Sequence, residues 1–158
     1  MAQQPIDLEL TRFAFQEIND EADIDKIRSF DLAIGNENEG ETIRAYQAAA
    51  TCMMANYVFS PTSKLKYFNE GKQLLETLIL AEKTVEKVYI RLLIQLNVPR
   101  ILNYHKNIEA DIIYLEKYLV EAPINLAYKK TMLSNLVSIS KKKDVKNALL
   151  KIKVMEAG

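Results

Sequence analysis

Apolar residues recur every three or four positions through most of this chain, which is the spacing that one face of an α-helix requires. The clearest case is the segment 61–82, where Ser60 and Pro61 fit an N-cap followed by proline at the first helical position. Its apolar face consists of Leu65, Phe68, Gly71, Leu74, Leu75, Leu78 and Ile79. We therefore predict a helix over about 61–82.

The neighbouring segments differ in how much of their circumference is apolar. Residues 41–59 are rich in alanine and methionine, which allows close helix approach, and residues 85–97 are apolar almost all round. A helix of the second kind is buried on most sides, so we expect 85–97 at the centre of the fold. From Pro99 to about residue 120 we predict an amphipathic helix, whose apolar residues are Ile101, Tyr104, Ile108, Ile112, Leu115 and Leu119.

Shorter helices are predicted at both ends of the chain. Residues 8–18 and 24–34 are followed by a polar loop, 35–40, which we expect to be the most flexible segment. After Pro123, two more helices are expected to face inward through Leu126, Leu133, Leu136, Val137, Val145, Ala148, Leu149 and Ile152. Strand signals are nearly absent, so the fold class is all-α.

The helical pairs begin near residues 41, 83 and 124, a regular interval that stacked helical hairpins produce. We predict one domain over 1–158, with acidic helices and a loop in 1–40 and antiparallel hairpins in 41–82, 83–122 and 124–154. A tetratricopeptide-like array is the nearest named architecture, although the tryptophan of that repeat is missing. Three hairpins also fit a closed bundle.

Composition and charge narrow the function. Half of the residues are hydrophobic (49%), Cys52 is the single cysteine, and no apolar run reaches the roughly 20 residues that span a bilayer. We expect a soluble, cytoplasmic protein without a disulfide, metal site or cofactor. Twenty-one basic and twenty-one acidic residues balance, but residues 1–42 hold eleven acids and three bases.

The C-terminal part is rich in lysine. We predict a basic patch formed by Lys129, Lys130, Lys141, Lys142, Lys143 and Lys146. The acidic and basic ends carry opposite charge, so they can attract each other within one molecule or between neighbouring molecules. The alternative is that each end is only a solvated helix face. Phosphates of a nucleic acid, or an acidic partner, are alternative targets of the lysines, but the chain is neutral overall and the tail has no arginine for base reading.

One polar line crosses the apolar helix 85–97. On a helix, Thr84, Lys87, Arg91 and Gln95 fall on one narrow strip. A guanidinium there needs a carboxylate, and Asp111 is our predicted partner. This pair either fixes the register of two hairpins or, together with Glu86, Gln95 and Tyr104, lines a polar pocket for a small molecule or a reaction.

These residues also carry a resemblance. The resemblance is to a sequence pattern that begins in a helix with an aromatic residue and alanine and ends at an aspartate. The positions of this chain that match it are Ala45, Tyr46, Lys64, Leu65, Gly71, Lys72, Glu86, Arg91, Gln95, Pro99, Leu102, Tyr104 and Asp111. Over about residues 41–111 the chain resembles a family of small, uncharacterised, all-helical bacterial proteins. Val88 and Asn103 stand where that pattern has an arginine and a glycine. The resemblance implies the fold and no known activity.

No catalytic constellation is evident. His105, the single histidine, has Glu109 four positions later as a partner for general base chemistry, but we expect a surface histidine. Cys52 is expected to fill the core. The leading hypothesis is a non-catalytic interaction or scaffold module for a protein or peptide, including another copy of itself.

Overall fold

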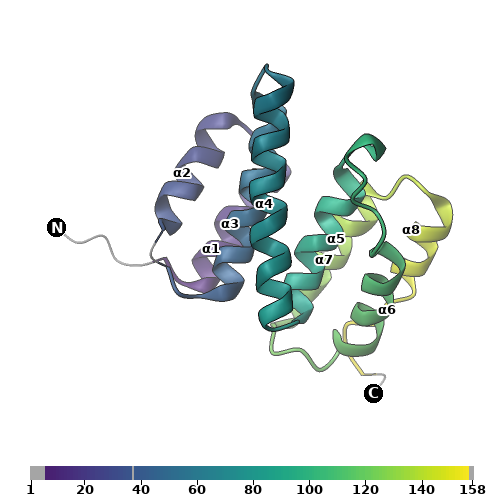
Figure 1. The fold of residues 1–158 in the computed structure, drawn as a ribbon. Coiled ribbons are helices and arrows are strands. Elements are labelled where there is room, and N and C mark those ends of the chain that lie inside the picture. The colour runs from purple at the N-terminus through teal and green to yellow at the C-terminus, as the bar shows by residue number, and fades with distance from the viewer. Residues whose placement is uncertain (1–5, 37, 157–158) are drawn as a thin grey trace. The chain divides into compact units, whose positions relative to one another are not determined.

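The computed structural model describes residues 6–36 and 38–156, which form eight α-helices and two 3₁₀ turns without a strand (Figure 1). The predicted all-α class is confirmed. The chain divides into two compact units, Met1–Glu82 and Lys83–Gly158, and the single domain expected from the sequence stays a prediction. The division falls where the second predicted hairpin begins.

The N-terminal unit contains four helices. They are α1 (Leu8–Asp20), α2 (Ile24–Ile34), α3 (Glu41–Met54) and α4 (Pro61–Ala81), with a 3₁₀ turn, Ala55–Tyr57, after α3. Side chains of Asp7, Asp23 and Ser60 accept hydrogen bonds from the first turns of α1, α2 and α4, satisfying backbone N–H groups that have no helical partner. The predicted helices at 24–34 and 61–82 are therefore confirmed, the second ending one residue early.

Helix α3 is the core of this unit and packs against α1, α2 and α4. Its alanines from Ala48 to Ala50 are almost completely buried. At Gly71 of α4, an added Cβ would lie 2.5 Å from the Ala48 carbonyl oxygen and 2.5 Å from the Cys52 Sγ. The close approach of α3 and α4 therefore requires glycine at this position.

An aromatic cluster joins α1 and α2 to α3. The ring of Phe15 lies 6.0 Å from that of Phe30 and 4.9 Å from that of Tyr46, measured between centroids. All three side chains are buried, and their tilted rings suit the quadrupoles of aromatic pairs. The cluster anchors the acidic N-terminal helices on a large apolar surface.

The C-terminal unit is built around α5 (Val85–Asn97), which packs against α6 (Ile108–Tyr118) and α7 (Leu126–Ile139), while α8 (Lys143–Leu150) covers both of the latter. Every residue of α5 from Val85 to Gln95 is buried, which confirms the expected central helix. Its Tyr89 hydroxyl accepts a hydrogen bond from Asn135 Nδ2 of α7 at 2.9 Å.

The observed start of α6 corrects our prediction. We predicted a helix from about Pro99, but Arg100–Leu102 is a 3₁₀ turn and Asn103 has a left-handed backbone with φ of 51°. An α-helix cannot continue through a left-handed residue, so α6 begins at Ile108. Ile101 consequently lies outside the apolar stripe and is 90% exposed.

Two further apolar residues expected to face inward are exposed. Leu65, in the first turns of α4, and Leu126, the first residue of α7, retain 49% and 38% of their accessible surface. Periodicity identifies the face of a helix on which a residue lies, but not how far the neighbouring helix extends along it. Within the ranges that the structure describes, no helix is both long and apolar enough to cross a membrane.

Candidate functional site

The polar line predicted on α5 is present and buried. Thr84 caps the helix by accepting a hydrogen bond from the Lys87 N–H, and the side chains further along have exposed fractions of 1% for Lys87, 7% for Arg91 and 0% for Gln95. Buried polar groups of this kind persist only where hydrogen bonds offset the loss of water. The line therefore requires partners on neighbouring helices.

Asp111 of α6 is the partner of Arg91. The guanidinium donates from Nη2 to Oδ1 at 2.6 Å and from Nε to Oδ2 at 2.9 Å, and Gln95 Nε2 donates to Oδ2 at 2.8 Å. The Gln95 Oε1 in turn accepts the backbone N–H of Asn107 at 3.0 Å. Bidentate, charge-assisted bonds of this geometry are the strong ones in proteins.

The other two members of the predicted cluster are buried in the same unit. Glu86 is 5% exposed and Tyr104 is 2% exposed, while Asp111 has no accessible surface. Arg91, Gln95 and Asp111 are closed against one another within the C-terminal unit. This closure favours the structural interpretation of the ion pair over an open pocket.

The basic patch is only partly on the surface. Lys130, Lys141, Lys142, Lys143 and Lys146 are exposed. Lys129 is buried, and its Nζ donates to the carbonyl oxygen of Val120 at 2.6 Å. It is therefore a structural lysine, because its ammonium satisfies a backbone acceptor in the chain that follows α6.

Neither residue considered for nucleophilic or acid-base chemistry gains catalytic partners. His105 lies before α6, so it does not share a helical face with Glu109, and its Nε2 lies 3.1 Å from the carbonyl oxygen of Val98. Burial against α4 raises the pKa of Cys52 to about 12, which keeps the thiol protonated. Among the described residues, no group of three or more His, Cys, Asp or Glu is placed to hold a metal ion.

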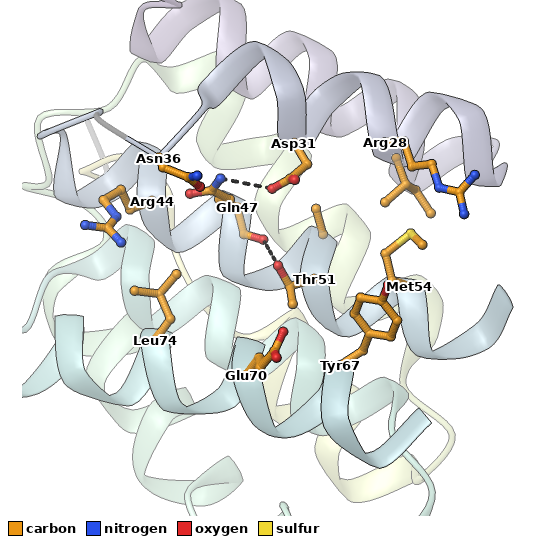
Figure 2. A pocket seen from close by; sticks show the side chains of 12 residues that line it. Arg28, Asp31, Asn36, Arg44, Gln47, Thr51, Met54, Tyr67, Glu70 and Leu74 are labelled. Atoms are coloured by element: carbon orange, nitrogen blue, oxygen red, sulfur yellow. Dashed lines mark hydrogen bonds between the residues drawn. The ribbon is translucent and has the colours of Figure 1, made fainter. Parts of the chain in front are cut away.

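The N-terminal unit contains a site that the sequence does not reveal: a cavity of about 390 Å³ between α2, α3 and α4 (Figure 2). We call it the N-terminal cavity. It is lined by Ile27, Arg28, Asp31, Asn36, Arg44, Gln47, Ala50, Thr51, Met54, Tyr67, Glu70 and Leu74. Its residues come from three helices and the loop after α2, and each charged one resembles an ordinary solvated position when its helix is considered alone.

Gln47 fixes the floor of this cavity. Its side chain is 93% buried, and Nε2 donates to Asp31 Oδ1 at 2.9 Å and to the Gly35 carbonyl oxygen at 3.1 Å. One turn later, Thr51 Oγ1 donates to the Gln47 carbonyl oxygen at 3.0 Å. An amide on a helix otherwise lined with alanine was the one available sequence signal for a polar site here.

Fold and sites together define an all-helical protein with a closed polar network in one unit and an open polar cavity in the other. Comparison with models of known families, with curated proteins and with solved structures finds no match for this chain. The resemblance to a bacterial helical family therefore stays a prediction.

Proposed function

We propose that this chain is a non-catalytic interaction module whose partner is a protein or peptide, including a second copy of the chain. The observation that supports it most directly is the partition of charge between the two units. Residues 1–82 hold fourteen acidic and seven basic residues, and residues 83–158 hold seven acidic and fourteen basic residues. A neutral chain is thus divided into a unit of charge −7 and a unit of charge +7.

Separated charge of this size acts at a distance. Complementary potentials accelerate encounter with an oppositely charged surface and orient the partner before contact. When the partner is another copy, the acidic unit of one chain faces the basic unit of the next, which is a heterologous contact. Attraction between the two units of one chain competes with this pairing. Dilution favours the attraction within one chain over the pairing between copies.

Apolar side chains on the surface add to this proposal. Leu10 and Phe13 lie three residues apart on α1, on the face opposite the buried Phe15 and Ile18, and they are 58% and 67% exposed. Side chains at this spacing are neighbours on a helix. Such a pair offers a partner apolar area beside the acidic groups of the same unit.

The closed network of Arg91, Gln95 and Asp111 supports a non-catalytic role. Arg91 and Gln95 both donate to the Asp111 carboxylate, and Gln95 Oε1 accepts a backbone N–H of the same unit. A reacting group needs access to substrate. Arg91, Gln95 and Asp111 are at most 7% exposed, so a substrate has almost no access to them. We therefore assign the network to stability of the C-terminal unit.

The test is light scattering of the full chain across protein concentration at about 10 mM and at about 1 M salt, between which the Debye length falls from roughly 30 to 3 Å. We expect a mass that grows with concentration at low salt and returns to the monomer at high salt. Replacing the exposed Lys130, Lys141, Lys142, Lys143 and Lys146 with glutamine should abolish the growth.

The matched control removes positive charge from the acidic unit instead, through Lys26→Gln and Lys66→Gln. It makes that unit more negative, so association should be unchanged or stronger. A chain that is monomeric in both salts, captures no protein partner and turns over a small molecule contradicts the proposal. Retention on heparin that depends on the same lysines, without protein capture, favours the nucleic-acid alternative.

A further inference from the structure

The N-terminal cavity holds two positive and two negative side chains. Arg28 and Asp31 come from α2, Arg44 from α3 and Glu70 from α4. In Figure 2, Asp31 and Glu70 lie on opposite walls near the middle of the cavity. The guanidiniums of Arg28 and Arg44 lie toward its two ends. The lining therefore has no net charge but separated charges of both signs.

These charged groups have bonding capacity left over. The side chains of Arg28 and Arg44 make no hydrogen bond or ion pair with another residue in the described part of the chain. Asp31 accepts from Gln47 through Oδ1 only, and the nearest cation to Glu70 is Lys66 Nζ, at 4.0 Å. Unused donors and acceptors that line a hollow are what a polar ligand requires.

Apolar side chains complete the walls. Met54 and Tyr67 lie at the end of the cavity near Arg28, and Leu74 lies at the other end near Arg44 (Figure 2). The volume of about 390 Å³ falls at the lower end of the range of small-molecule sites, roughly 300 to 1,000 Å³. The cavity thus combines an apolar wall with fixed charges of both signs.

We propose that the N-terminal cavity binds a small zwitterion with an apolar side chain, an α-amino acid or a short peptide. The ligand ammonium lies between Asp31 and Glu70, and its carboxylate pairs with Arg44, the less exposed of the two arginines. Its side chain packs on Met54 and Tyr67. Gln47 holds the Asp31 carboxylate in place and leaves its second oxygen for the ligand. This proposal is independent of the association proposed above.

The experiment is an NMR titration of the full chain that follows the side-chain amide of Gln47. The probes are L-leucine, trileucine, leucinamide, which lacks the carboxylate, and 4-methylpentanoate, which lacks the ammonium. We expect saturable shifts with leucine or trileucine, and binding weaker by about tenfold or more for the two probes that lack one charge. Tighter binding of trileucine identifies a peptide as the source of the zwitterion, and tighter binding of leucine identifies a free amino acid.

Variants locate the site. Asp31→Asn and Arg44→Gln should each weaken binding by about tenfold. Glu39→Gln and Arg100→Gln remove the same charges from exposed positions outside the cavity and should leave binding unchanged. Saturable shifts absent with both leucine and trileucine, or equal affinity for leucinamide, overturn the proposal. The probe comparison uses the parent chain, so it decides the matter even if a variant fails to fold.

Discussion

Arg91 and Asp111 meet in a two-pronged contact inside the C-terminal unit, with Nε 2.9 Å from one carboxylate oxygen and Nη2 2.6 Å from the other. They come from α5 and α6 and are 20 positions apart in the chain. The pair therefore sets the register of one helix against the next, and both side chains are buried.

Arg91→Met should destabilise the protein by about 3–5 kcal/mol, because the Asp111 carboxylate is left buried without its counter-charge. Chemical unfolding in urea, followed by circular dichroism, measures the change. Arg100→Met, at an exposed arginine, is the control and should stay within about 0.5 kcal/mol of the parent.

The double variant Arg91→Met with Asp111→Leu should recover much of that loss, since removing both charges also removes the cost of burying them. The same urea measurement completes a double-mutant cycle. A double variant as unstable as Arg91→Met alone would mean that the pair is not the cause of the instability.

Gly71→Ala should cost about 1–3 kcal/mol, because the new methyl group would lie 2.5 Å from the Ala48 carbonyl oxygen and would force α3 and α4 apart. Thermal and urea unfolding report the loss. Gln73→Ala, at an exposed position of the same helix, is the control. A Gly71→Ala protein as stable as the parent contradicts the close approach of these helices.

Lys129→Met should cost about 1–3 kcal/mol, because the carbonyl oxygen of Val120 loses its ammonium donor. The adjacent Lys130→Met removes the same charge from an exposed side chain and should change stability by less than about 0.5 kcal/mol. Equal effects of the two substitutions in urea unfolding would show that Lys129 acts only through its charge.

Cys52 makes stability depend on alkaline pH. Its folded pKa of about 12 lies above the ordinary value of 9.0, so the unfolded chain loses the thiol proton first as the pH rises. The thiol thus contributes stability that is fully present below pH 9 and falls by up to about 1.4 kcal/mol per pH unit between 9 and 12. Cys52→Ala should flatten this decline, as urea unfolding at pH 8, 9 and 10 will show. A decline just as steep in Cys52→Ala contradicts the raised pKa.

Local signals made most of the fold predictable. Residues 24–34 and 85–97 match observed helices at both ends, because caps, apolar periodicity and turn residues act within a few positions of each boundary. The spacing on α5 also predicted the polar line, and the position of Asp111 on the apolar face of the next predicted helix made it the expected partner of Arg91. The start of α6 could not be predicted, because it depends on the left-handed backbone of the single residue Asn103.

The charged lining of the N-terminal cavity could not be predicted from the sequence for a different reason. Asp31, Arg44 and Glu70 lie on three helices, and no spacing within one helix relates them. Only the packing of α2 and α4 on α3 brings them to one hollow. A site assembled from surface positions of separate helices is a tertiary property, so periodicity carries no trace of it.

The link from α4 to α5 consists of only Glu82, Lys83 and Thr84, so the sign of the charge reverses within one short stretch. Isoelectric focusing averages over that reversal and reports only an isoelectric point, about 6.6 from the sequence. A charged resin instead senses whichever unit faces it. Near neutral pH the same molecule should therefore be retained by both an anion exchanger and a cation exchanger, as a block polyampholyte would be.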